Sequence, residues 1–261
     1  MLNLAIECSG VAGSVALYAG HNLLVAHQLP PEIGSVQTLA ATIQRLLSQP
    51  DTPAARRVDL ISVTCGPGSF TGLRVGLATA QMLAFAWRIP VAPVDTLAAI
   101  AHGVALEHLQ LGSSAPALIV PVLNAFRSQV FASAWLQSVW LQNGPPAAET
   151  VLTELAPAQV VPAADWQAAP WESLTRSGAG EAALGRLQSN VCQVLVCGSG
   201  LRTYQPLETT KQALVEQRLW EPTAEIVGQL GWHMYQRGAV VTANQLRPNY
   251  VRASAAEEQR R

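Results

Sequence analysis

The residues with the clearest chemical potential form one glycine-rich stretch, Cys65-Gly66-Pro67-Gly68-Ser69-Phe70-Thr71-Gly72. Residues 58–64, just before it, are rich in β-branched side chains and have the length of a buried strand. Pro67-Gly68 predicts a turn, and the hydroxyl of Ser69 or Thr71 can cap a following helix. A strand, a tight turn and a helix N-terminus gather backbone N–H groups and the positive end of the helix dipole, which favours an anion such as phosphate.

A candidate anion or nucleotide site combines this stretch with an acid at the end of the first expected strand, where an open α/β sheet presents its ligand crevice. Its members are Glu7, Ser9, Gly66, Gly68, Ser69 and Thr71. The stretch is neither a P-loop, since no Lys-Ser/Thr pair follows the last glycine, nor a dinucleotide fingerprint, because the glycine spacing differs. A purely structural turn is an equal alternative.

Other catalytic signatures are missing from the sequence. A nucleotide hydrolase needs acids at both strand ends to hold magnesium or orient water, whereas Glu7 at the first is matched by the amide Asn124 at the second. No His-x-x-x-His, Cys-x-x-Cys or Gly-x-Ser-x-Gly pattern occurs. The sequence therefore predicts no metal site and no catalytic residue.

The elements that position the glycine-rich stretch follow from periodicity. Expected strands are 2–6, 13–18, 23–29, 58–64 and 91–94, and expected helices are 35–47, 72–87 and one capped by Asp95. A three-stranded meander that feeds a crossover helix and further parallel strands predicts a mixed sheet with helices on its faces.

The second half repeats this order weakly. Strands are expected at 117–123, 128–141 and 150–155, with a hairpin turn at Asn143-Gly144 and a last strand at 191–196. Residues 156–190 predict loops and short helices anchored by Trp166 and Trp171, and Gly198-Ser199-Gly200 predicts a turn. Pro222 is expected at the first position of a final helix that Gly238 ends.

The expected helix 72–87 is apolar nearly all round. Small residues recur every fourth position at Gly72, Gly76, Ala80 and Ala84, and only a narrow polar stripe interrupts the larger side chains. Such a helix is covered on nearly all sides. It is either central to a large domain or packed between its own sheet and a second protein chain, and the second hypothesis is preferred here.

Composition restricts the class of protein. The 261 residues carry a net charge of −1, with 13% charged residues, which argues against a polyanion-binding protein held by bulk electrostatics. The N-terminus lacks the basic region of a signal peptide, and no apolar run reaches the length of a membrane span. We expect a cytoplasmic protein without a membrane partner and with reduced thiols.

Several motifs together resemble one family. They are Leu4-Ala5-Ile6-Glu7-Cys8-Ser9, the Gly66–Gly76 block GPGSFTGLRVG, Pro93-Val94-Asp95-Thr96-Leu97, Asn124-Ala125-Phe126-Arg127-Ser128-Gln129-Val130-Phe131 and Pro248-Asn249-Tyr250-Val251-Arg252. In this order they are similar to the TsaB (YeaZ) family over nearly the whole chain. Two positions depart from the family pattern: Asn124, where Asp is frequent, and Gly34-Ser35, where His-Ser is common.

The resemblance implies an α/β fold of the actin-like ATPase (ASKHA, RNase H-like) type with two related lobes. The first lobe would be 1–105 joined by the helix 222–238, the second, reduced lobe 106–220, and the tail 239–261. The implied role is a non-catalytic partner of the TsaD threonylcarbamoyl transferase, which forms N6-threonylcarbamoyladenosine next to the anticodon of tRNAs. A TsaE-like ATPase would join, tRNA would bind through the complex, and ATP or ADP would be held there.

The resemblance also places the partner surface on the first two helices. The implied interface residues are Val36, Leu39, Ile43, Gly72, Val75, Gly76, Thr79, Ala80 and Leu83. Without a partner, this face is expected to pair two copies of the chain as a homodimer. The alternative function is an autonomous ASKHA-fold ATPase or small-molecule kinase that uses Glu7 and the glycine-rich turn.

Overall fold

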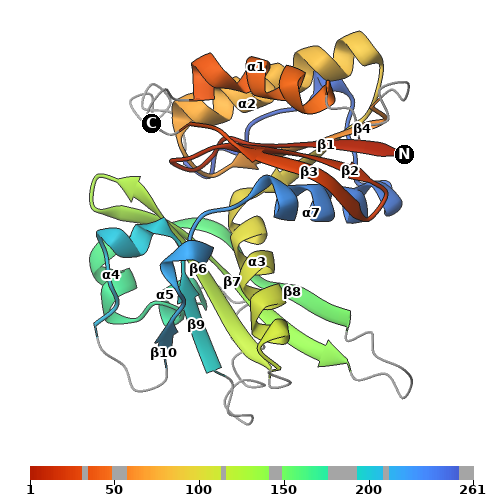
Figure 1. The fold of residues 1–261 in the computed structure, drawn as a ribbon. Helices are drawn as coiled ribbons and strands as arrows, with labels where there is room; N and C mark the ends of the chain where they lie inside the picture. The colour runs from red at the N-terminus through yellow and green to blue at the C-terminus, as the bar shows by residue number, and fades with distance from the viewer. Residues whose placement is uncertain are drawn as a thin grey trace. The chain divides into compact units, whose positions relative to one another are not determined.

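The computed structural model describes residues 1–30, 35–48, 58–112, 116–140, 149–175, 193–207 and 212–252. They contain two five-stranded sheets with the strand orders β3-β2-β1-β4-β5 and β10-β9-β6-β7-β8 (Figure 1). The chain divides into two compact units, one made of Met1–Ala99 with Pro222–Tyr250 and the other of Ile100–Glu221 with Val251–Arg261. None of the helices in the described ranges is long and apolar enough to cross a membrane.

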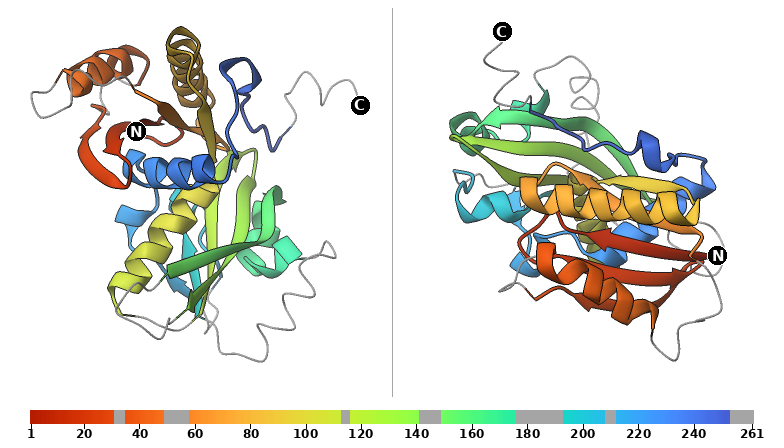
Figure 2. Two further views of the ribbon diagram at one scale, coloured as in Figure 1. Left: turned by 90° about the vertical axis from the view of Figure 1, so that its right-hand side faces the viewer. Right: turned by 90° about the horizontal axis from the view of Figure 1, so that it is seen from above.

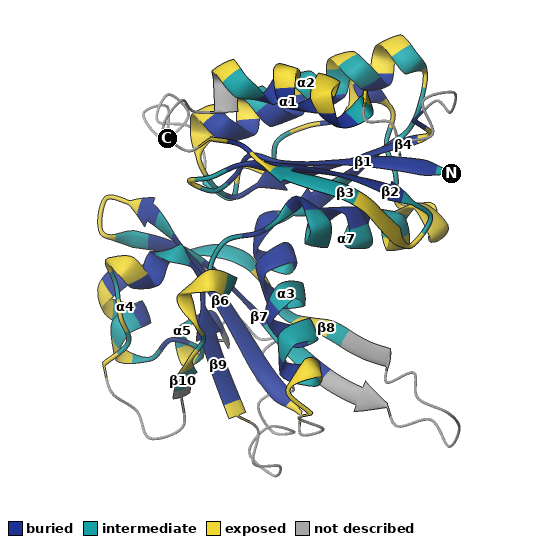
Figure 3. Ribbon diagram, viewed as in Figure 1, coloured by how far each residue is buried: buried dark blue, intermediate teal, exposed yellow. Residues whose placement is uncertain are grey.

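The first unit begins with the expected meander. Its strands are β1 (Leu2–Glu7), β2 (Ser14–Ala19), β3 (Asn22–Gln28), β4 (Leu60–Gly66) and β5 (Val91–Asp95). β1 pairs antiparallel with β2 and parallel with β4, so that it lies at the centre of a mixed sheet. Figure 3 shows that β1 is buried along its length, as expected for a central strand covered on both faces.

Side-chain alternation along β1 divides the covering helices between the two faces. Leu4 and Ile6 belong to the core cluster that contains residues of α1 (Ser35–Leu47) and α2 (Phe70–Trp87), whereas Ala5 belongs to the cluster of α7 (Ala224–Gln236). On the first face, α2 packs against α1 and against the short 3-10 helix η3 (Ala243–Gln245), and the right-hand view of Figure 2 shows it between them.

The final helix starts later than expected. Thr223 is its N-cap, because the Thr223 hydroxyl accepts a hydrogen bond from the Ile226 N–H at 3.4 Å, and Pro222 precedes the cap instead of occupying the first helical position. The end agrees with the expectation: the helix stops at Gln236 and Gly238 follows with a φ of +70°.

The second unit holds the other sheet. Its strands are β6 (Ala117–Phe126), β7 (Gln129–Trp140), β8 (Glu149–Pro162), β9 (Gln193–Cys197) and β10 (Gln212–Leu214). Its helices are α4 (Ala163–Ala168), α5 (Glu172–Thr175), the 3-10 turns η1 (Ser199–Arg202) and η2 (Gln217–Leu219), and most of α3 (Thr96–Gln110). As expected, Asp95 caps α3, since its Oδ1 accepts from the Ala98 N–H at 2.9 Å.

Two expectations for this sheet are wrong. Residues 156–162 are strand and not loop, because β8 pairs with β7 from Glu149 opposite Trp140 to Pro162 opposite Gln129. β9 is not the last strand, because the three-residue β10 pairs with it in parallel. The anticipated turn at Asn143-Gly144 lies outside the described residues, and Trp166 is fully buried as expected of an anchor.

Candidate functional site

The glycine-rich turn packs tightly onto the residues that follow β1. Ser69 N–H donates to Ser9 O at 2.8 Å, and the Ser69 hydroxyl accepts from Gly72 N–H at 3.3 Å as the N-cap of α2. A Cβ on Gly68 would lie 2.6 Å from Ser9 O, and one on Gly72 would lie 2.0 Å from Cys8 O. Glycine is required at both positions because backbone approaches backbone.

The carboxylate of Glu7, at the end of β1, accepts hydrogen bonds from the same loop. Its Oε1 accepts hydrogen bonds from the Ser9 N–H at 2.5 Å, the Ser9 hydroxyl at 2.6 Å and the Gly10 N–H at 3.2 Å. Glu7 is fully buried, and three donors converge on this one carboxylate oxygen. Its carboxylate therefore fixes the loop onto which α2 is packed.

The structure brings together only part of the candidate anion site. Glu7, Ser9, Gly68 and Ser69 form one continuous set of contacts. Gly66 instead faces the C-terminal segment, where a Cβ would lie 2.8 Å from Asn249 O, and Thr71 is exposed on α2.

Asn124, the amide at the matching strand end of the second unit, has a local structural role. Its Oδ1 accepts from the Phe126 N–H at 2.7 Å. That bond supports a turn in which Phe126, Arg127 and Ser128 have φ values of 60°, 51° and 56°. Gly34, the other departure from the family pattern, lies outside the described residues.

The described cysteines are poor nucleophiles. Cys8, Cys65 and Cys197 are buried. Burial raises the pKa of the Cys65 thiol to about 12, with a further contribution from the Asp95 carboxylate. Burial also raises the pKa of the Cys8 and Cys197 thiols well above the usual range. Since the thiolate is the reactive form, these side chains are packing groups.

Thiol labelling checks this directly. In a Cys192→Ser background, Cys65 is expected to react with a disulfide reagent at pH 8 roughly 1,000-fold more slowly than a free cysteine, because a pKa of about 12 leaves so little thiolate, and Cys8 and Cys197, whose pKa burial raises further, should react at least as slowly. The rate should rise with pH and reach that of a free thiol in denaturant. Fast labelling of the folded chain at pH 8 would contradict the burial of these groups.

The small-residue face of α2 is covered by the chain itself. Gly72, Gly76 and Ala80 are buried, and a Cβ on Gly76 would lie 3.2 Å from Cys8 Cβ. The small side chains let α2 approach its own β1 and the loop after it, and the contact of these three residues with a second chain stays a prediction.

The other implied interface residues differ in how far they are exposed. Leu39 and Ile43 of α1 are 1% and 5% exposed and belong to the core of the chain, and their part in an interface stays a prediction. Val75, Thr79 and Leu83 are half-buried along the flank of α2. The side chain of Val36 lies outside the described residues.

The exposed face of α2 is nevertheless apolar. Met82 and Phe85 are 73% and 68% exposed, and Ala78, one turn earlier, is exposed as well. We call Ala78, Met82 and Phe85 the outer stripe of α2. At the start of the helix the Arg74 guanidinium lies 3.8 Å from the centre of the Phe70 ring, so that the cation caps the stripe by a cation–π contact.

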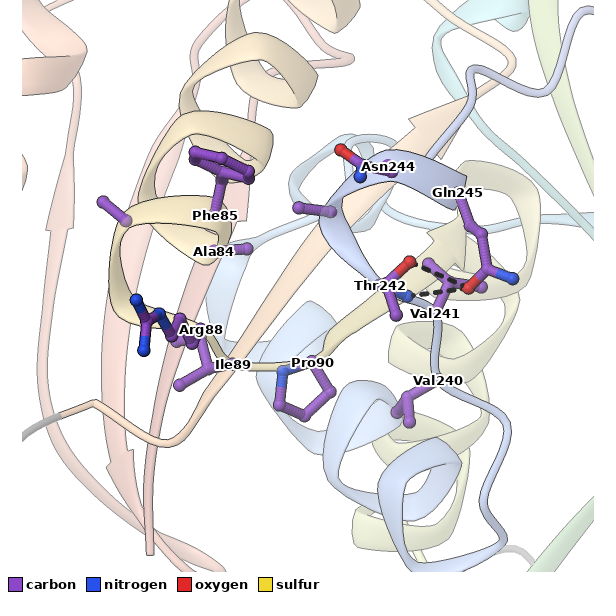
Figure 4. A pocket seen from close by; sticks show the side chains of 12 residues that line it. Ala84, Phe85, Arg88, Ile89, Pro90, Val240, Val241, Thr242, Asn244 and Gln245 are labelled. Atoms are coloured by element: carbon purple, nitrogen blue, oxygen red, sulfur yellow. Dashed lines mark hydrogen bonds between the residues drawn. The ribbon is translucent and has the colours of Figure 1, made fainter.

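A pocket extends the outer stripe at the C-terminal end of α2. It has a volume of about 680 Å3 and lies between residues 84–90 and 240–245 (Figure 4). Figure 4 shows Phe85 and Ala84 on one wall, with Val240, Thr242 and Asn244 on the other. Nothing in the local sequence pattern indicated this pocket, because its two walls are about 150 residues apart in the chain.

Comparisons with known proteins agree with this fold. The family model TsaD, described as tRNA N6-adenosine threonylcarbamoyltransferase, matches residues 32–258. A Haemophilus influenzae protein named tRNA threonylcarbamoyladenosine biosynthesis protein TsaB is 34% identical over 250 residues, which cover 95% of this chain and 92% of that protein. The Bacillus subtilis protein of the same name is 29% identical, and the chain spans 64% of its length.

Two solved structures have the same fold as this chain over nearly its whole length. YeaZ from Pseudomonas aeruginosa is 25% identical, with a TM-score of 0.64, and the match covers 95% of this chain and 99% of that one. A second Pseudomonas aeruginosa structure, described as an uncharacterized protein with similarity to peptidase YEAZ, gives a TM-score of 0.66 at 24% identity over 96% of this chain and 99% of that one. The expected two-lobed, actin-like ASKHA fold is confirmed. With the match to the Haemophilus protein over nearly its full length, the chain belongs to the TsaB (YeaZ) family.

Proposed function

We propose that this chain is the non-catalytic partner subunit of a TsaD-type threonylcarbamoyl transferase and is needed to form N6-threonylcarbamoyladenosine in tRNA. Relatives that are similar in sequence carry the name tRNA threonylcarbamoyladenosine biosynthesis protein. The observation that carries the proposal is the outer stripe of α2, an apolar surface on a helix whose opposite face is already buried. Exposed apolar patches of this kind mark protein-binding sites.

The glycine-rich turn supports this role as a structural element. Glu7, Ser9 and Ser69 use their hydrogen bonds to fix α2 against β1, which holds the outer stripe in place. We infer that the turn serves the position of α2 and that any nucleotide is held by the complex. In this proposal the TsaE-like ATPase and tRNA join through the transferase, and two copies of the chain pair through the stripe when the transferase is absent.

Depletion of the chain from cells tests the function. N6-threonylcarbamoyladenosine in bulk tRNA, measured by mass spectrometry, should fall to near zero and return when the chain is supplied again. The purified chain alone should not modify tRNA. Unchanged modification after depletion would refute the proposal. Steady ATP hydrolysis by the purified chain, lost in Glu7→Gln, would favour the autonomous ATPase instead.

A further inference from the structure

The pocket beside α2 is held open by contacts within the chain. Gln81 Nε2 donates to Ala243 O at 2.9 Å and ties the middle of α2 to η3. Val241 exchanges two backbone hydrogen bonds with Val91, at 2.9 and 2.8 Å, which fixes the other end of the segment to the sheet. A pocket built from such fixed walls is largely formed before a ligand arrives.

The pocket is lined by apolar side chains where it meets the core and by polar side chains at its rim. Ala84 is buried in the core, and Ile89 and Val241 pack against the same core from the two walls. The Thr242 N–H and hydroxyl both donate to Gln245 Oε1, at 3.1 and 3.0 Å, so both Thr242 donors are used within the chain. The pocket therefore favours an apolar group more than a ligand with many polar atoms.

Two arginines flank the pocket. Arg88, the exposed C-cap of α2, lines one side. On the other side the Arg247 guanidinium donates to Asn244 O at 2.7 Å and to Leu246 O at 2.8 Å, which holds the cation beside η3.

The helices on this face of the sheet, together with the segment after α7, also carry only arginines as charged residues. α1, α2 with its C-cap, and residues 239–250 contain four arginines and no Asp or Glu, although the chain as a whole has 17 acids and 16 basic residues. The arginines are Arg45, Arg74, Arg88 and Arg247. Segments whose charged residues are all arginines favour a partner with acidic residues opposite them.

We propose that this pocket is the socket for a bulky apolar side chain of the transferase partner, with Asp or Glu residues beside it on the partner surface. The inference rests on the proposed function and adds the chemistry of the partner surface. The apolar residue fills the space between Phe85 and Val240, in continuation of the outer stripe, and the acidic residues face Arg88 and Arg247. A central apolar anchor with charged surroundings is the arrangement in which interface energy is concentrated.

Filling the pocket tests the socket. Asn244 is exposed on the wall of the pocket, so Asn244→Trp should occupy the space without disturbing the core. We expect the Kd for the purified transferase to rise by about 10-fold or more, the usual loss when an anchor residue is displaced. The matched control is Gln236→Trp at an exposed position of α7, on the opposite face of the sheet, which should leave the Kd unchanged.

Charge exchange tests the acidic surroundings. Arg88→Glu should weaken transferase binding by about 10-fold, more strongly at low than at high salt, because opposite charges become like charges. Arg88→Lys keeps the charge and the same backbone demand and should stay within about threefold of the parent. Equal effects of Glu and Lys, or binding that is independent of salt, would overturn the acidic partner surface.

The outcomes separate this inference from the proposed function. If Met82→Glu abolishes transferase binding while Asn244→Trp does not affect it, the socket is refuted and the proposed function stands. If neither variant weakens binding, the transferase contacts neither the outer stripe nor the pocket, so the socket is refuted, and the proposed function is decided by the depletion experiment. If Asn244→Trp disrupts only the pairing of two copies of the chain in light scattering, the occupant is a second copy and the inference is refuted.

Discussion

Replacing Met82 and Phe85 together by glutamate is expected to abolish binding to the transferase while the chain stays folded. Both side chains are more than two-thirds exposed, so their loss removes little from the core of the free protein. In the complex, burial of each would contribute about 1.5–3 kcal/mol, and a buried carboxylate in its place would add a desolvation cost. The Kd should therefore rise by at least about 100-fold.

Calorimetry or co-purification with the transferase measures this loss, and circular dichroism with thermal unfolding checks the fold. The conservative pair Met82→Leu and Phe85→Leu should retain most of the affinity, because the surface stays apolar. A glutamate at Tyr235, which is 38% exposed on α7, should have no effect. If the double glutamate variant binds within threefold of the parent, the outer stripe is not the partner surface.

Local periodicity accounts for how well the elements were predicted. α1 has its apolar residues on one side only, and its observed bounds, Ser35–Leu47, are those expected. The cap at Asp95 was also predictable, and for α2 the sequence offered the hydroxyl of Ser69 or Thr71, of which the structure uses Ser69. In contrast, β8 extends through Ala, Pro and Gln residues, and only its pairing with β7 makes them a strand.

The sequence of α2 does not show which of its faces packs against the sheet. Its residues are apolar on nearly every side, so the pattern does not distinguish a face on the sheet from a face on a partner. The decisive neighbour is the loop after β1, about 60 residues earlier, whose backbone at Cys8 approaches Gly72. Contacts over such distances in sequence depend on the tertiary fold, and the pocket beside η3 has the same origin.

Gly72→Ala is expected to destabilise the chain severely. The added Cβ would lie 2.0 Å from the Cys8 carbonyl oxygen, a separation that Cβ atoms essentially never show. Alanine has the higher helix propensity by about 1 kcal/mol, but that gain cannot offset a clash with backbone that the rest of the sheet holds in place. We expect the free energy of unfolding to fall by about 3 kcal/mol or more, measured by urea denaturation.

Gly76→Ala is the matched control one turn later in the same helix. Its Cβ would lie 3.2 Å from the Cys8 Cβ, a side-chain atom that can shift by a few tenths of an ångström. The gain in helix propensity and the cost of that shift are similar, so the net change should lie within about 1 kcal/mol. The two glycines therefore separate backbone contact from helix propensity. Equal effects at Gly72 and Gly76 would mean that the glycine-rich turn does not hold α2 against β1, and the structural interpretation of the turn would be wrong.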